Sequence, residues 1–206
     1  LAHRDRGDHI VTTQIEHPAV LETCRYLERR FGFRVTYLPV DGQGQVEPAA
    51  VEAALTPRTL LVSVMHANNE TGVLQPVAAI AAIARRHGVL VHTDAAQSVG
   101  KVPVNVAELG VDLLTVAGHK LYAPKGVGAL YVRRGTVLDP LIHGAGHEGG
   151  RRAGTENVAG IVGLGAACAV ARERLAAELP RLTALRDRLG AALAAAGWVL
   201  NGHPTA

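Results

Sequence analysis

Short β-type runs alternate with helical runs along most of this chain, and this alternation limits its possible folds more than any other feature. The helical stretches are Pro18–Arg30, Pro48–Leu55 and Val77–His87, and the strand-like runs around them are HIVTT, RVTYLPV, LLVSVM, VLVHTD, DLLTVA and GALYVRR. Such alternation is typical of βαβ units with a parallel sheet. Runs that are apolar throughout, such as LLVSVM, suit strands covered by helices on both faces. The sequence therefore predicts an α/β fold, a three-layer α/β/α sandwich with a mostly parallel sheet.

Two further segments differ from the alternating pattern: one joins DLLTVA to GALYVRR, and the other begins at Val158. GHKLYAPKGVG contains too many Gly and Pro residues for a regular helix, so we predict a loop there. From Val158 the chain is rich in Ala and Leu, and we expect a helix that Pro180 kinks or divides. Its leucines share one face and are expected to pack on the domain, with a partner-binding zipper as the alternative: Leu175, Leu179, Leu182, Leu185, Leu189 and Leu193. The run Trp198–Leu200 is predicted to begin a strand.

Composition excludes several classes of protein. The chain has 206 residues, of which 48% are hydrophobic, so it can bury a substantial core. Its net charge of +3 is scattered and aromatic residues make up 3%, which argues against a nucleic-acid surface. No run approaches the roughly 20 apolar residues of a membrane-spanning helix. Cys24 and Cys168 lie far apart and form no disulfide or metal pattern, so we expect a cytoplasmic protein.

Polar residues follow three of the predicted strands. LLVSVM runs into HANNETG, VLVHT runs into Asp94–Gln97, and DLLTVA runs into Gly118–Lys120. Open α/β sheets bind ligands at the carboxyl ends of their strands. Taken singly, an Asp there is usually a helix cap and a Lys is usually a solvated surface charge. Together they indicate a partly buried site with shifted ionisation.

Pyridoxal phosphate (PLP) needs such a set of groups. An amine must form an imine with it, a carboxylate must keep its pyridine nitrogen protonated, and donors must hold its phenolic oxygen and phosphate. The residues chemically suited to these tasks are Lys120, Asp94, Gln97, Asn69 and His119.

Five segments also carry a family resemblance: QIEHPAVLETC, MHANNETGVLQP, VHTDAAQSVGK, DLLTVAGHKLYAPKGVGALYVRR and HGAGHEGGRRAGTEN. They resemble the cysteine desulfurases and selenocysteine lyases of the class V aminotransferase group, over nearly the whole chain. The resemblance implies the PLP-dependent transferase fold type I. Residues 1–174 would be the PLP-binding large domain, incomplete at its N-terminus, and residues 175–206 a connecting helix and the start of the small C-terminal domain. We therefore expect an internal part of a longer protein.

The resemblance also implies roles for single residues. Lys120 would carry the cofactor covalently, and Asp94 would pair with the pyridine nitrogen. Gln97 and Asn69 would approach the phenolic oxygen, and His119 would contact the phosphate. Many desulfurases have a serine where this chain has Ala117, so a phosphate hydrogen bond would be lost or taken over by Thr115 or water.

Three further histidines and a threonine belong to the same comparison. His17 would stack on the cofactor ring and serve in acid–base work, with a role at a helix start as the alternative. Thr155 would reach the phosphate held by a neighbouring subunit, which implies a homodimer, and it is also a candidate helix cap. His143 and His147 lack an accompanying ligand set, so we predict no metal site.

The implied reaction is removal of sulfur from L-cysteine, which gives L-alanine and an enzyme persulfide for iron–sulfur cluster or thio-cofactor synthesis. A sulfur-acceptor protein would be the partner. The alternatives are a selenocysteine lyase or another class V member, and a truncated, inactive scaffold. We expect Cys24 and Cys168 to be ordinary packed residues, and the nucleophilic cysteine and the substrate-binding arginine to lie outside this chain. On its own, this chain is expected to be inactive as a desulfurase.

Overall fold

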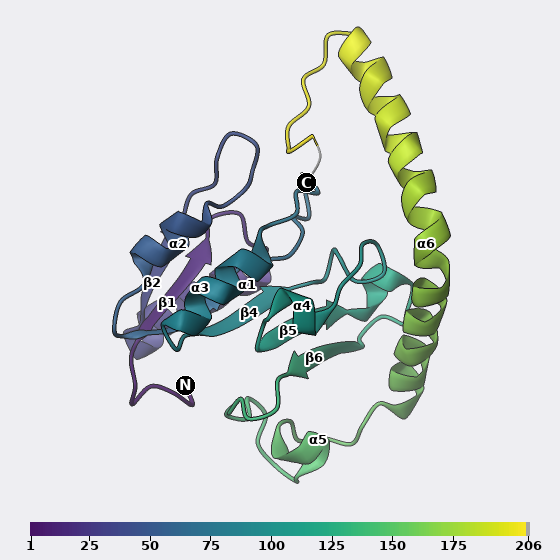
Figure 1. The fold of residues 1–206 in the computed structure, drawn as a ribbon. Coiled ribbons are helices and arrows are strands. Elements are labelled where there is room, and N and C mark those ends of the chain that lie inside the picture. Colours follow the sequence, from purple (N-terminus) through teal and green to yellow (C-terminus); the bar gives the residue numbers. More distant parts are fainter. Residues whose placement is uncertain (205–206) are drawn as a thin grey trace.

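Six strands form one sheet in the order β2-β1-β3-β4-β5-β6 (Figure 1). The computed structural model describes residues 1–204. All pairs among the first five strands are parallel, and β6 runs antiparallel to β5. The strands are β1 (His9–Thr13), β2 (Arg34–Leu38), β3 (Thr59–Ser63), β4 (Leu90–Asp94), β5 (Leu113–Ala117) and β6 (Gly128–Val132). The predicted mostly parallel sheet is confirmed.

The helices are α1 (Pro18–Phe31), α2 (Pro48–Ala54), α3 (Val77–Arg86), α4 (Val106–Leu109), the 3₁₀ helix η1 (Gly118–Leu121), α5 (His147–Gly150) and α6 (Val158–Ala195). Along the chain α1 to α4 and η1 lie between strands, as the alternation predicted, and α5 and α6 follow β6. Helix α1 begins where Pro18 fixes a helical φ, and it ends at Gly32, which takes the left-handed conformation at φ 67°. The breaker-rich segment after β5 forms only the four-residue η1, so the prediction of an irregular segment there is confirmed.

Helices cover both faces of the sheet because alternate residues of each strand point to opposite sides. In β1, Val11 belongs to the core cluster that includes Ile80 of α3 and Val51 of α2. Its neighbour Ile10 belongs to the cluster on the other face, with Cys24 of α1. This arrangement is the predicted three-layer sandwich.

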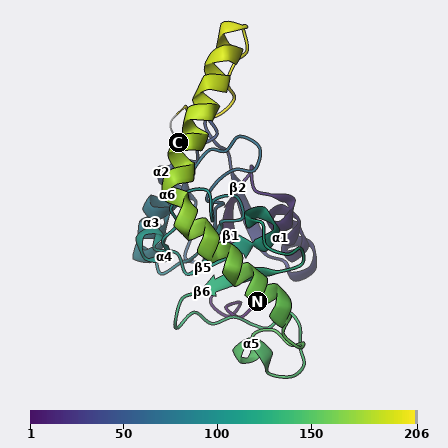
Figure 2. The same cartoon turned by 90° about the vertical axis from the view of Figure 1, so that its right-hand side faces the viewer.

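Helix α6 departs from the prediction. It continues through Pro180 as one helix of 38 residues, with no new start there. Near its beginning, Leu164 is buried with Leu121 of η1, but the later part of the helix extends away from the body (Figures 1 and 2). The predicted packing of the leucine face on the domain is therefore wrong for the residues that remain exposed by 43–62%, which are Leu182, Leu185, Leu189 and Leu193.

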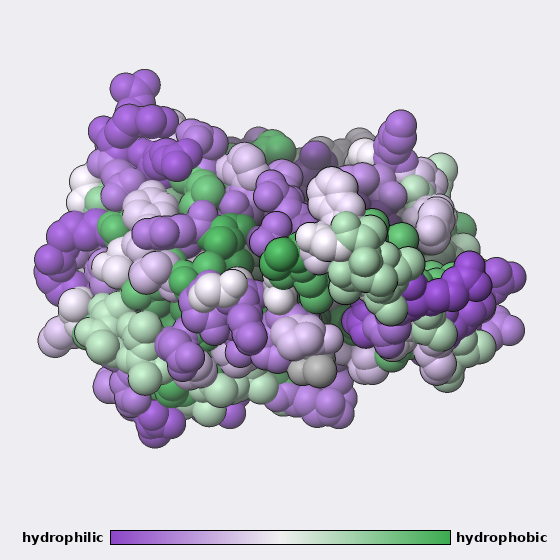
Figure 3. All heavy atoms as spheres, turned by 90° about the horizontal axis from the view of Figure 1, so that it is seen from above, coloured by the Kyte–Doolittle hydropathy of each residue, from purple (hydrophilic) through white to green (hydrophobic). Residues whose placement is uncertain are grey.

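Apolar residues also lie at the surface after α6. Trp198, Val199 and Leu200 are exposed and form no strand, so the prediction of a strand there is wrong. Seen from above, the surface shows hydrophobic residues interspersed with hydrophilic ones (Figure 3). None of the helices within residues 1–204 combines the length and the apolar character needed to cross a membrane.

Candidate functional site

The sheet brings four chain segments to the same edge. β1, β3, β4 and β5 are parallel and adjacent, so the segments that follow them begin at the carboxyl ends of neighbouring strands. His17 follows β1, Asn69 follows β3, Asp94 ends β4, and Lys120 lies in η1 after β5. The topology thus collects an imidazole, an amide, a carboxylate and an amine at one rim, where open α/β sheets bind ligands.

Asp94 is fixed by its own backbone and by the neighbouring strand. Its carbonyl oxygen accepts from the N–H of His66 at 2.9 Å, and its side-chain Oδ1 accepts from the N–H of Ala96 at 2.9 Å. The next residue, Ala95, is fully buried, and its N–H donates to the Thr115 carbonyl at 3.0 Å. The carboxylate therefore stands at a rigid strand end and remains partly exposed.

Gln97 is held by a lysine that sequence reasoning missed. Lys101 Nζ donates to Gln97 Oε1 at 2.6 Å. Burial lowers the pKa of Lys101 first, and the positive charge of Lys120 lowers it further. The four-residue spacing of Gln97 and Lys101 in the sequence was the signal that could have predicted this contact.

Lys120 sits in a tightly built turn. The N–H of Gly118 donates to the Val127 carbonyl at 3.1 Å, and a Cβ at Gly118 would lie 2.6 Å from that oxygen. Lys120 itself is partly buried, and His119 is exposed. After η1 the chain turns at Tyr122, which has a left-handed φ of 66° and is fully exposed. The close approach of two backbone segments thus fixes the position of the lysine.

The turn between β1 and α1 carries His17. Its Nδ1 accepts from the N–H of Ala19 at 3.2 Å, so His17 caps α1, which was the structural role weighed for it. The preceding residue, Glu16, is buried and accepts from the N–H of Met65 at 2.8 Å. His17 is partly buried, and its cap interaction leaves Nε2 available.

The segment after β3 contains two asparagines with different environments. Asn68 is buried, and its Nδ2 donates to the Ile15 carbonyl at 3.1 Å, which ties this segment to the His17 turn. Its Oδ1 accepts from the backbone N–H groups of Glu70 and Thr71, both at 2.9 Å. Asn69 is exposed. Asn68 therefore builds the loop, and Asn69 is the one whose side chain is free for a ligand.

Comparison with known proteins identifies the family of this chain. The family model described as "Aminotransferase class-V" matches residues 1–203. This chain belongs to the class V aminotransferase family. It is 54% identical over 182 residues to "Cysteine desulfurase IscS" of Dictyoglomus turgidum, covering 88% of this chain and 46% of that protein. It is 50% identical over 205 residues to the protein of the same name from Methanosarcina thermophila, covering 99% of this chain and 50% of that one.

Solved structures agree with this assignment. A chain described as "NifS-like protein" superposes with a TM-score of 0.89 at 44% identity, covering 93% of this chain and 53% of that one. A structure described as "SspA in complex with cysteine" superposes with a TM-score of 0.77 at 45% identity, covering 81% and 48%. The class V chain therefore spans about half the length of the relatives it matches, and its fold is that of the PLP-dependent fold type I enzymes.

Two threonines named in the sequence analysis of this class V chain have different environments. Thr155 is exposed between α5 and α6, and its hydroxyl forms no hydrogen bond within residues 1–204. The alternative role of Thr155 as a helix cap is wrong, because Asn157 accepts from the N–H of Gly160 and caps α6. Thr115 already bonds His92 Nε2 at 2.9 Å through its hydroxyl, so this oxygen is engaged beside Ala117.

The two cysteines differ in environment. Cys24 is buried in α1, where burial raises the pKa of its thiol to about 11. Cys168 is exposed on α6, so the expectation that it is a packed residue is wrong. Its position on the outer side of the helix could not be read from its apolar neighbours in the sequence.

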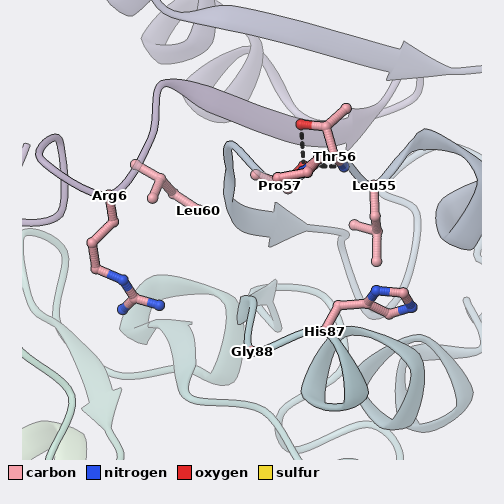
Figure 4. A pocket seen from close by; sticks show the side chains of 8 residues that line it. Arg6, Leu55, Thr56, Pro57, Leu60, His87 and Gly88 are labelled. Carbon is pink, nitrogen blue, oxygen red and sulfur yellow. Dashed lines mark hydrogen bonds between the residues drawn. The ribbon is translucent and has the colours of Figure 1, made fainter.

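A pocket of about 290 Å³ lies elsewhere, at the amino ends of β3 and β4 (Figure 4). Its polar lining residues are Arg6, Thr56, Thr59 and His87. Because Thr59 begins β3 and Gly88 precedes β4, this pocket is on the opposite rim of the sheet from Asp94 and Lys120. It therefore takes no part in the candidate site.

Proposed function

We propose that this chain is the PLP-holding part of a cysteine desulfurase, which removes sulfur from L-cysteine and releases L-alanine. The observation that carries the proposal is the placement of Asp94, Gln97 and Lys120 at the ends of adjacent strands. Relatives about 50% identical to this chain are named cysteine desulfurase, and one similar structure is described as a complex with cysteine. Cysteine is therefore the substrate we propose.

The residues present fit the cofactor. Lys120 offers the amine that would carry PLP, Asp94 offers a fixed carboxylate for the pyridinium, and Gln97 offers an amide at the same rim. When bound, PLP would supply an electron sink for negative charge at the substrate α-carbon. Exposed Asn69 and His119 would supply donors for its oxygens. These residues support the proposal that this chain holds the cofactor.

Each side chain would then have a defined task. Asp94, held by the Ala96 N–H, would keep a proton on the pyridine nitrogen of the cofactor. Lys120 Nζ would accept the proton of the substrate α-carbon and return it. His17, fixed by its cap, would lie against the ring and take part in proton transfer through Nε2.

The sulfur-accepting thiolate would come from another part of the protein. Cys24 lies in the α1 core, and its raised pKa leaves little thiolate at neutral pH. Cys168 is on α6, outside the four-strand rim. We therefore expect these 206 residues alone to hold the cofactor without completing turnover of cysteine.

The larger assembly is part of the same proposal. We propose a homodimer in which Thr155 reaches the phosphate in the neighbouring subunit, which its exposure supports. A sulfur-acceptor protein such as an iron–sulfur scaffold would take the persulfide sulfur in the cytoplasm. We also propose the division into residues 1–174 and 175–206, with α6 running across this boundary.

The test is an absorbance titration of the purified chain with PLP. We expect the visible band of a lysine–PLP imine in the wild type, and its loss in Lys120→Ala. Lys125→Ala is the matched control, because Lys125 is an exposed lysine of the same segment, and it should retain the band. A band that persists in Lys120→Ala and disappears in Lys125→Ala would overturn the assignment. A folded wild type without a band would favour the inactive scaffold.

A further inference from the structure

Glu16 is a buried acid beside the proposed site that the proposed function does not use. Its side chain is almost inaccessible, with 4% of the residue exposed. Oε1 accepts two hydrogen bonds, from the N–H of Met65 and from the hydroxyl of Thr13, both at 2.8 Å. The other oxygen, Oε2, is buried and has no hydrogen-bond partner among residues 1–204. A buried polar atom without a partner is costly and calls for a reason.

The position of Glu16 follows from where β1 separates from the chain that continues after β3. The register of β1 with β3 ends at Thr12 and Ser63, but the chain after β3 remains bonded to β4. There the N–H groups of Val64 and His66 donate to β4, so the intervening N–H of Met65 points toward the place that β1 has left. Glu16 Oε1 takes the place of the missing strand carbonyl. The side chain therefore ties the turn before His17 to the end of β3.

A second bond fixes the same turn. Asn68 Nδ2 donates to the Ile15 carbonyl at 3.1 Å, one residue before Glu16. Asn68 and Met65 both belong to the segment after β3, so two successive residues of the turn are attached to it. His17 comes next and caps α1. The direction of its ring is thus set by an anchored turn rather than by a free loop.

The charge of Glu16 is constrained by its surroundings. Burial raises the pKa of Glu16 to about 7, the bonds from Met65 and Thr13 oppose this effect, and the charge of Asp94 adds to it. The titratable groups around it are Asp94 from β4, Cys24 from α1 and His17 on its own turn. Glu16 forms no ion pair in the part of the chain that the structure describes.

We propose that Glu16 is a positioning residue that holds the His17 turn against the end of β3 as a neutral acid, with its proton on Oε2 and the negative charge left on Asp94. Two accepted bonds occupy Oε1, so Oε2 is the oxygen that can carry the proton. The role assigned to the turn rests on the proposed function, because it is His17 that meets the cofactor there. The protonation of Glu16 and the anchoring of the turn do not depend on the cofactor, because both concern contacts within this chain.

Glu16→Gln tests the charge state. The amide keeps an oxygen for Met65 and Thr13 and places an NH₂ group where the acid has its O–H, so it imitates the neutral form. In infrared difference spectra near pH 5, we expect a protonated-carboxyl C=O band of a buried acid in the wild type and its loss in Glu16→Gln. Glu156→Gln is the control, because Glu156 is exposed and its replacement should leave the buried-acid band unchanged. No band assignable to Glu16 at that pH would overturn the proposal.

The pH dependence of unfolding gives a second measurement. The pKa of Glu16 is raised above its ordinary value of 4.5 to about 7 in the folded chain, so its proton stabilises the fold below about pH 4.5, and this contribution is lost as pH rises to about 7. The unfolding equilibrium constant of the wild type, relative to Glu16→Gln, should rise up to about 100-fold between pH 4.5 and 8. A ratio that does not change with pH would overturn the neutral-acid assignment.

The anchoring role needs its own readout. The N–H of Ala19 donates to His17 Nδ1, so its NMR shift reports the position of the His17 ring. Glu16→Gln should leave this resonance unchanged at pH 5.5, whereas Glu16→Ala should shift or broaden it, because Met65 loses its acceptor. If Glu16→Ala does not fold, Glu16→Gln still tests the anchoring role, because a shifted Ala19 resonance in that variant would refute it. All these measurements use the chain without PLP, so a failure of PLP binding would count against the proposed function alone.

Discussion

Gly118→Ala should destabilise the turn that presents Lys120. An added Cβ would lie 2.6 Å from the Val127 carbonyl oxygen and 3.2 Å from Ala123 Cβ. Because the nearest atom is backbone, the strands or η1 must move, and the 3.1 Å bond from Gly118 N to that carbonyl must weaken. Overpacking costs about 1–3 kcal/mol and a lost hydrogen bond about 0.5–1.5 kcal/mol. We therefore expect a loss of about 2–4 kcal/mol in the free energy of unfolding.

Urea unfolding of paired glycine variants measures this loss. Gly165→Ala is the control, because Gly165 lies within α6 and a Cβ there would meet nothing within 4 Å. That change should stabilise the chain by up to about 1 kcal/mol, since alanine is the better helix former. Gly118→Ala should also weaken PLP binding, because Lys120 lies two residues away. A free energy of unfolding within about 0.5 kcal/mol of the wild type would refute the reasoning.

Two further predictions concern the thiols and a buried histidine. Cys168 should react with a thiol reagent in the native chain, whereas Cys24, buried with a pKa of about 11, should react only after denaturation; equal native rates would contradict this. His92→Gln should cost about 1–2 kcal/mol at pH 7, because His92 bonds Ser63 at 2.8 Å and Thr115 at 2.9 Å. Burial lowers the pKa of His92 below 6.5, so its stabilising contribution is lost as pH falls through 6.5. The urea midpoints of the wild type and His92→Gln should therefore converge between pH 7 and 5.

The sheet could be predicted from the sequence because its signal is local. Strands of a covered parallel sheet are apolar on both faces, so runs such as that ending at Met65 stand out without knowledge of their partners. The observed strands differ from the predicted runs by at most two residues at their ends, where assignments are least definite. The rim bearing Asp94 and Lys120 follows from the same pattern, since parallel neighbours share an edge.

Features that depend on what covers a surface could not be predicted. Leucine spacing in α6 identifies a face, but it does not say whether anything packs on it, and Leu189 remains 62% exposed. Cys168 and Thr155 show the same limit, because neighbouring residue types do not reveal exposure. The cap of α6 fell on Asn157 rather than Thr155, a shift of two residues that depends on where the helix leaves the loop.

Glu16 shows why a residue beside the proposed site could not be identified from the sequence motif. A glutamate is usually exposed, and in sequence it is only the neighbour of His17. It becomes buried because β1 stops while the chain after β3 continues, which leaves the Met65 N–H in need of an acceptor. A carboxylate there would stand near Asp94 without a cation, so the physically consistent form is the protonated acid. The end of the β1–β3 register thus gives Glu16 its buried place between the His17 turn and Met65.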